Sequence, residues 1–394
     1  MSIDVSDHAS DIDLFTDESL DDPFPSHRVL RDRGPATYLS GHDLWYLGRY
    51  AEVRAALSDW ETFSSAKGTG LNDVINEAWS STVIMVDPPV HTKLRKLFTD
   101  RLGRRQLKPI SETIDQRAKQ LAEKLVQQGE FDGVRDMAHD LPANVIMDLV
   151  GWPESERSNL MEYASGSFDC VGPENQRMTD GMPKLAESIE YVTDIYDSGR
   201  LTPGSFGYTI AEAAAIGEIT KDDAIGLLLS YAVAAFDTTI NAMSSGMWLF
   251  AQNPEQWQIF RRDPALAAAA FNETVRLECP LQFFSRMTTR DVDMGDGVMI
   301  PAGARVLISF GGANRDGRHY EDPDEFRIER NPVDHLAFGS GVHACVGQNL
   351  ARMEGIAVFR AMASRAKTVE LNGPVVRALN NMTRGLESLP LRVS

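Results

Sequence analysis

The spacing of apolar positions predicts helices over most of the chain. After Pro109, apolar side chains from Ile110 to Leu125 recur every three or four residues, which is the spacing of an amphipathic helix. Residues 265–279, with a proline on either side, and residues 348–365 show the same spacing. We therefore expect a mainly α protein.

Strand patterns are confined to two regions, which indicates a smaller β-rich lobe. Residues 37–47 and 292–310 are rich in residues that favour strands, and Asp296-Gly297 is typical of a tight hairpin turn. No internal repeat, low-complexity tract or Gly/Ser linker divides the chain. We expect residues 1–394 to form one unit, with residues 1–20 as a loosely ordered N-terminal arm.

Residues 220–252 form the longest apolar stretch. Thr220 to Asp223 resembles a helix-capping box, and Asp237 is the only charged residue from 224 to 252. A membrane span and a buried core helix both suit such a run, but its polar residues and the lack of flanking basic clusters favour the buried helix. Burying an unpaired carboxylate costs on the order of 2–7 kcal/mol or more, so Asp237 indicates chemistry or a specific partner.

Charge and cysteine content exclude several classes of protein. The chain has 57 Asp and Glu against 39 Lys and Arg, a net charge of −18, which disfavours binding to nucleic acid or to an anionic membrane. Its three cysteines form no C-x-x-C pair, so a disulfide framework and a zinc ribbon are both disfavoured. The acidic N-terminus lacks the pattern of a signal peptide. We expect a soluble, cytoplasmic protein.

The segment Phe338-Gly-Ser-Gly-Val-His-Ala-Cys-Val-Gly347 is the strongest chemical signal. Its G-x-G-x-x-A spacing matches a dinucleotide fingerprint, but the preceding residues contain a proline and too little strand. The second interpretation centres on Cys345, which follows a glycine-rich loop and precedes a helix. A helix N-terminus lowers the pKa of a thiol, and such a cysteine is typical of an axial thiolate ligand to haem iron. A lone cysteine is otherwise more often buried and inert.

Together with two further segments, this motif resembles the cytochrome P-450 superfamily. Five residues match its haem-binding signature: Phe338, Gly341, His343, Cys345 and Gly347. Glu273-Thr-Val-Arg276 is similar to the E-x-x-R of the family's K helix, and residues 234–239 to its oxygen-activating segment on the I helix. The resemblance runs from about Asp21 to the C-terminus. It implies the P-450 fold, haem b with Cys345 as the iron ligand, and O2 as co-substrate.

The resemblance also implies roles for residues on both sides of the haem. Asp237 and Thr238 are similar to the acid–alcohol pair that relays protons. Ala235 stands where the family commonly has glycine, and its methyl group is expected to narrow the groove. Other residues match positions that contact the haem, the last four of them positions that bind its propionates: Ala234, Phe338, Gly339, His91, Arg95, Arg286 and His343. Glu273 and Arg276, completed by Arg330, match a structural group of buried charges that supports folding.

Substrate positions are implied by the same resemblance. They are mostly apolar or small: Ser81, Phe168, Val171, Ser230, Val233, Leu281, Phe284, Ser285 and Met382. Residues 289–291, 338–348 and 380–390 are similar to those of bacterial enzymes that O-demethylate or hydroxylate para-substituted benzoates. That subgroup binds the carboxylate with an arginine, whereas residues 76–82 contain no basic residue and include Glu77. Both a benzoate and a neutral phenol or methoxyphenol therefore stay open.

The source of electrons is expected to be a separate protein, because the chain has no room for a flavin reductase domain. A ferredoxin is the first choice and a flavodoxin the second, each with a reductase that uses NAD(P)H. A basic run offers a docking site through Arg101, Arg104, Arg105 and Lys108, although a solvated helix face has the same pattern. We expect a monomer. A peroxygenase and a haem-based sensor are the alternatives, and the Asp237-Thr238 pair disfavours both.

Overall fold

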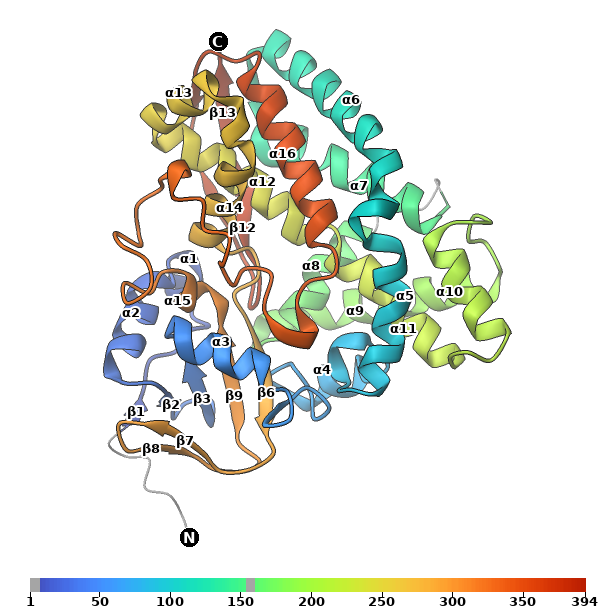
Figure 1. Ribbon diagram of the computed structural model, residues 1–394, viewed down its shortest axis with the longest axis vertical. Coiled ribbons are helices and arrows are strands. Elements are labelled where there is room, and N and C mark those ends of the chain that lie inside the picture. Colours follow the sequence, from blue (N-terminus) through green and yellow to red (C-terminus); the bar gives the residue numbers. More distant parts are fainter. Residues whose placement is uncertain (1–7, 154–159) are drawn as a thin grey trace.

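The computed structural model describes residues 8–153 and 160–394, and most of them are helical (Figure 1). The helices before the long apolar segment are α1 (Asp17–Asp21), α2 (Phe24–Arg33), α3 (Tyr50–Ser58), α4 (Asp73–Ala78), α5 (Val90–Leu102), α6 (Arg104–Gln128), α7 (Asp140–Val150), α8 (Leu160–Asp169), α9 (Gln176–Asp197) and α10 (Phe206–Ala215). Those that follow are α11 (Lys221–Ala234), α12 (Asp237–Gln252), α13 (Pro254–Arg262), α14 (Ala267–Glu278), α15 (Phe310–Asn314) and α16 (Gln348–Ala363).

The strands gather mainly in one sheet at the end of the molecule opposite α6 and α13 (Figure 1). Its order is β1 (Ala9–Ser10), β2 (Thr37–Leu39), β3 (Leu44–Leu47), β9 (Arg305–Ser309), β6 (Phe283–Thr288) and β4 (Phe63–Ser64). Smaller sheets pair β10 (Val369–Leu371) with β13 (Pro390–Val393) and β5 (Glu130–Asp132), β11 (Val376–Leu379) with β12 (Arg384–Ser388), and β7 (Val292–Gly295) with β8 (Val298–Ile300). The predicted mainly α fold with a smaller β lobe is confirmed.

The expected hairpin and capping box both form. Asp296 and Gly297 connect β7 to β8 with φ values of 51° and 79°, the left-handed backbone that such a two-residue turn requires. At the start of α11, the Thr220 hydroxyl accepts from the N–H of Asp223, and the Asp223 carboxylate accepts from the N–H of Thr220. These turns depend on short-range chemistry, which is why the local sequence predicts them.

The expectation of a loose N-terminal arm is wrong for the part of it that the structure describes. Ala9 and Ser10 pair in parallel with β2 at the edge of the sheet. Leu14 and Phe15 are buried in the core, and the Thr16 side chain caps α1. Because the arm is mostly acidic, its composition did not indicate that Leu14 and Phe15 are buried. Residues 1–7 lie outside the described part of the chain.

Two helices begin or end where the pattern did not predict it. The helix expected after Pro109 already starts at Arg104 and contains the proline, which removes one backbone donor without ending the helix. The apolar stretch 220–252 is divided into α11 and α12, with Ala235 and Phe236 between them. Within the described chain, Lys221–Gln252 is the single segment long and apolar enough to cross a membrane. Most of it is buried inside the protein, which favours the core-helix interpretation.

Candidate active site

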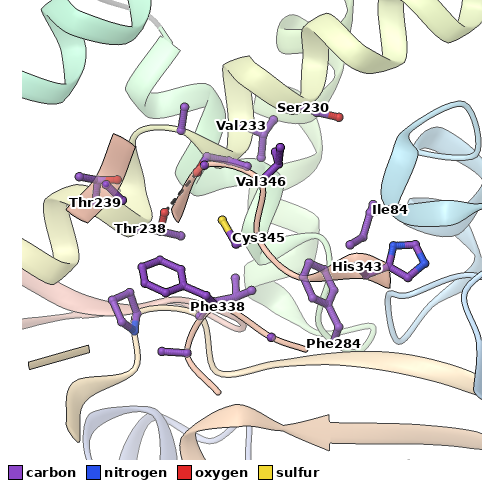
Figure 2. Close-up of a pocket in the computed structure, with 18 of the residues that line it drawn as sticks. Ile84, Ser230, Val233, Thr238, Thr239, Phe284, Phe338, His343, Cys345 and Val346 are labelled. Carbon is purple, nitrogen blue, oxygen red and sulfur yellow. Dashed lines mark hydrogen bonds between the residues drawn. The ribbon is translucent and has the colours of Figure 1, made fainter. Parts of the chain in front are cut away.

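A mostly apolar cavity lies where three distant segments meet. The break between α11 and α12 forms one wall, the loop that precedes α16 forms the opposite wall, and β6 runs along one edge. The cavity has a volume of about 270 Å³, near the lower end of the roughly 300–1000 Å³ of ordinary ligand pockets. Figure 2 shows Cys345 inside this cavity, with Thr238 on one side and Phe284 and His343 on the other.

The conformation of the cysteine loop depends on a backbone hydrogen bond and on one glycine at which any side chain would clash. The N–H of Cys345 donates to the carbonyl of Phe338 over 2.8 Å, which closes the loop. Gly341 has a φ of 69°, and a Cβ there would lie 2.2 Å from the carbonyl oxygen of Leu57. The segment before the loop is a short helical turn at Ile328–Arg330 followed by coil, not a strand. The dinucleotide interpretation therefore fails on its context.

The pKa of Cys345 does not behave as its place before a helix predicts. Burial raises the pKa of the thiol, and this outweighs the N–H groups of Gly347 and Gln348 and the positive charges of Arg95 and Arg352. The helix N-terminus contributes in the expected direction, but desolvation of the thiolate is the larger effect. A bound metal ion would remove the proton outright, because a coordinating thiol is deprotonated.

The opposite wall opens where α11 ends and α12 begins. Thr238 lies in the first turn of α12 and lines the cavity, and its hydroxyl donates to the Ala234 carbonyl across the break at 3.2 Å (Figure 2). Ala234 and Ala235 line the same wall. Ala235 has φ −86°, which any residue adopts, so the opening does not require glycine here.

Asp237 faces away from the cavity that Thr238 lines. Its carboxylate accepts from the Thr383 hydroxyl over 3.1 Å and interacts with the Asn241 side chain. Burial raises the pKa of Asp237 to about 6, so the group exchanges a proton near neutral pH. The two residues predicted as an acid–alcohol pair are thus neighbours in sequence, but the Thr238 side chain lines the cavity and the Asp237 side chain contacts Thr383 behind it.

A cluster of basic side chains forms one edge of the cavity. Arg95, Arg286 and His343 line it, and burial lowers the pKa of Arg286 to about 10. His91 does not line the cavity but packs against His343, with ring centroids 4.4 Å apart. Among the described residues, its buried Nε2 has no hydrogen-bond partner. An unpartnered donor beside buried cations fits the carboxylate groups of a ligand.

The three charges predicted to support the fold are in contact. Arg276 donates through Nε and Nη2 to both oxygens of Glu273, at 2.7 and 2.9 Å, and both side chains are fully buried. Its remaining N–H groups reach the carbonyls of residues 314, 323 and 325. Arg330 donates to Glu273 over 3.0 Å. The group connects α14 to the coil before the cysteine loop.

About half of the predicted substrate residues line the cavity. Those that do are Phe168, Ser230, Val233, Leu281 and Phe284, whereas Ser81, Val171, Ser285 and Met382 do not. Side chains on β6 alternate, so Phe284 and Arg286 face the cavity while the Ser285 hydroxyl turns away and donates to the Gly70 carbonyl. Val171 and Met382 are fully buried in the core. The residues after Ser81, from Thr82 to Ile84, take its expected place.

Several residues of the cavity lining were not predicted from the sequence, among them Trp79 and Glu354. Trp79 extends the apolar wall beside Thr82, and Glu354 lies nine residues beyond Cys345 on α16. Burial alone raises the pKa of Glu354 to about 8, so this acid is mainly protonated at neutral pH. The helical spacing from Leu350 to Glu354 places it on the buried face of α16, and that spacing is the feature that could have identified it.

Comparison with known proteins agrees with this geometry. The cytochrome P-450 family model matches residues 264–364. The chain is 38% identical to cytochrome p450 CYP199A2 of Rhodopseudomonas palustris over 97% of this chain and 94% of that protein. The chain belongs to the cytochrome P-450 family. It is also 32% identical to the beta-dihydromenaquinone-9 omega-hydroxylase of Mycobacterium bovis, over 98% of this chain and 79% of that one.

Solved P-450 structures have the same fold. The P450BioI complex with an acyl carrier protein superposes with a TM-score of 0.85 at 26% identity, covering 96% of this chain and 100% of the other. The epothilone D-bound P450epoK superposes with a TM-score of 0.86 at 24% identity, covering 98% of this chain and 99% of that one. The protein is a P-450 monooxygenase that uses haem b and O2, with electrons that come from NAD(P)H through redox partners.

The residues of the cavity fit haem b. Cys345 would hold the iron, and Arg95, Arg286, His343 and the unpartnered Nε2 of His91 would hold the propionates. When bound, the haem supplies reductive activation of O2. The chain would contribute an apolar wall with the Thr238 hydroxyl in it, and behind that wall the Asp237 carboxyl, whose pKa burial raises to about 6. That these two groups relay a proton from the interior toward the cavity stays a prediction.

Proposed function

We propose that this P-450 oxidises a small, neutral, para-substituted aromatic compound, by hydroxylation or by oxidative O-demethylation of a phenol. The observation that supports this most is the distribution of charge around the cavity. Among the described residues that line it, both arginines, Arg95 and Arg286, lie at the edge assigned to the propionates, next to His343, which is neutral because burial lowers its pKa to about 2. The wall next to Thr82, Ser230 and Phe284 is apolar or neutral.

A carboxylate substrate would lack a partner in this cavity. Desolvating a carboxylate without a cation or several hydrogen bonds costs on the order of 2–7 kcal/mol or more. A phenol is neutral at pH 7 and needs one acceptor, which the Ser230 hydroxyl provides because it donates its own proton to the Gly226 carbonyl. The likeness of residues 289–291 and 380–390 to enzymes of para-substituted benzoates supports the ring and its para substitution.

The chemistry of O-demethylation is balanced with one oxygen atom from O2. Hydroxylation of the methyl carbon of a methoxyphenol gives a hemiacetal, which loses formaldehyde and leaves the hydroquinone. The second oxygen atom leaves as water, with two electrons supplied by the redox partners and two protons.

Titration with a matched pair of ligands tests the substrate class. We expect 4-methoxyphenol to shift the haem spin state at a concentration at least about tenfold lower than 4-methoxybenzoate, a difference of about 1.4 kcal/mol. Thr82→Arg is expected to reverse the preference, since it adds the missing cation. Thr82→Gln, similar in size but uncharged, is the control and should retain it. Tighter binding of the benzoate by the unchanged protein would refute the neutral substrate.

Electrons are proposed to enter on the face next to Cys345, from a ferredoxin or a flavodoxin. Arg104 donates to Asn349 of α16 over 3.3 Å, four residues after Cys345, and Arg105 and Lys108 are exposed on the same helix. Arg101 instead donates to Thr209 of α10. The docking site therefore centres on Arg104, and an acidic redox protein would be attracted to it.

Charge reversal distinguishes docking from a solvated helix face. We expect the Arg104→Glu, Arg105→Glu double variant to be reduced about tenfold more slowly by an acidic ferredoxin at low salt, with a flatter salt dependence. Stopped-flow reduction under carbon monoxide measures this rate. The matched control is Lys119→Glu, Lys124→Glu, which reverses two exposed charges on the same helix α6 about 25 Å further along. Equal rates for the two double variants would place docking elsewhere.

A further inference from the structure

Two carboxyl groups lie on either side of one tight turn behind the active site. The turn comprises residues 380–383, and its first side chain, Asn380, accepts from the N–H groups of Met382 and Thr383. On one side, the N–H of Asn381 donates to Asp169 Oδ1 over 2.8 Å. On the other side, the Thr383 hydroxyl donates to Asp237 Oδ2 over 3.1 Å. Asp169 ends α8 and Asp237 begins α12, so the turn brings together acids that are 68 residues apart.

The surroundings of Asp169 make it a group that titrates near neutral pH. Its pKa is raised to about 7, mainly by burial, and the charges of Asp237 on α12 and Asp180 on α9 act in the same direction. The Asn381 N–H and Arg177 of α9 act in the opposite direction. The Arg177 guanidinium forms an ion pair with Asp17, which weakens its effect on the pKa of Asp169. The negative charge of Asp237 therefore acts on Asp169 across the turn, although burial is the larger cause of its raised pKa.

Asp169 is partly reached by solvent and follows a residue of the cavity wall. Its side chain is partly exposed, whereas Asp237 is enclosed by the protein. The preceding residue, Phe168, lines the cavity. Because Asp169 is reached by solvent and Asp237 is enclosed on the other side of the same turn, Asp169 is the one of the two acids that can take protons from solvent.

We propose that Asp169 is the solvent-side carboxyl of the proton relay and supplies Asp237. One proton leaves a carboxyl oxygen of Asp169 and ends on the Asp237 carboxylate, and solvent then returns one to Asp169. No electron moves in this step. Asp169 acts through Asp237 and does not touch the substrate, so it positions and supplies the relay. The inference rests on the monooxygenase reaction and not on the proposed aromatic substrate.

Two substitutions separate proton supply from support of the turn. Asp169→Asn keeps an oxygen that accepts from the Asn381 N–H but cannot carry a proton, whereas Asp169→Glu keeps the acid. Asp180→Asn, which removes another acid of the same neighbourhood that is exposed, is the control. Thr238→Ala, which removes the predicted relay hydroxyl, is the reference variant: it shows how much hydrogen peroxide forms when electrons are consumed without product. Each holoenzyme is assayed with one ferredoxin and reductase pair from pH 5 to 9, counting NADH, product and peroxide for whichever compound it turns over.

The unchanged enzyme is expected to slow as the pH rises through about 7, because Asp169 then loses its proton. Asp169→Asn should lower product formation about tenfold at pH 6, remove the fall between pH 6 and 8, and raise the solvent deuterium isotope effect. Asp169→Glu and Asp180→Asn should keep the fall.

An infrared titration of the carboxyl stretch gives a readout without turnover: Asp169→Asn should lower the pKa of the remaining Asp237 band. An unchanged pH profile in Asp169→Asn, or equal losses in Asp169→Asn and Asp169→Glu, would overturn the proposal.

Discussion

Cys345→Ser protein is expected to lose the thiolate-type spectrum of its reduced carbon monoxide complex and to have no measurable monooxygenase turnover. A serine hydroxyl is a far weaker ligand than a thiolate and donates less electron density, so cleavage of the O–O bond is no longer favoured. The variant should still fold, because serine has the same shape and its backbone N–H can still donate to the Phe338 carbonyl. The carbon monoxide difference spectrum of reduced protein measures the loss.

The other two cysteines supply the matched control. Cys170 and Cys279 are fully buried, and burial raises the pKa of each thiol to about 12, so both stay protonated. Cys170→Ser should keep the thiolate-type spectrum and the turnover of the unchanged enzyme. Retention of that spectrum in Cys345→Ser would contradict the assignment of the iron ligand.

Arg276→Ala is expected to be the most destabilising single substitution outside the haem ligand. Removing one partner of a buried ion pair typically costs about 3–5 kcal/mol, since the remaining charge is left without compensation. Here three backbone carbonyls also lose their donor, among them those of Asn314 and Pro323. We expect haem-free or misfolded protein, measured as the ratio of haem absorbance to protein and as the free energy of unfolding in urea.

A nearby, partly exposed arginine tests whether the loss of stability in Arg276→Ala depends on the burial of the side chain. Arg327 is partly exposed and its side chain pairs with Asp322 and Glu325 at the surface, whereas its contact with Glu273 is made by the backbone N–H. Arg327→Ala should therefore change the free energy of unfolding by less than about 1 kcal/mol. If Arg276→Ala gave stable protein with a full content of haem, the buried group would not be essential for folding.

Local sequence was sufficient for the features whose cause is local. The glycine-rich loop predicts Cys345 at the start of a helix, and the i, i+3 spacing predicts the pair of Glu273 and Arg276. The Thr220 capping box and the hairpin turn at Asp296 follow from side chains a few residues apart. Each of these depends on backbone geometry that neighbouring residues decide, so distant contacts do not alter them.

Two predictions about the cavity were wrong, one because side chains alternate along a strand and one because of burial. Ser285 was expected in the cavity, but its position between Phe284 and Arg286 on a strand turns it to the opposite face. The pKa of Cys345 was expected to fall, and burial raises it instead. Neither outcome can be read from spacing, because the face of a strand and the desolvation of a thiol depend on what packs against them.

By itself, the order of residues determined the family and the buried charge group and predicted Cys345 as the thiolate ligand, since these depend on motifs with fixed spacing. Only the folded chain decided that Asp169 and Asp237 lie on either side of the turn at 380–383 and that the buried Nε2 of His91 has no hydrogen-bond partner among the described residues. It also decided that the two arginines of the cavity lie at a single edge. Charge interactions act through space, and three-dimensional packing places side chains together that are far apart along the chain.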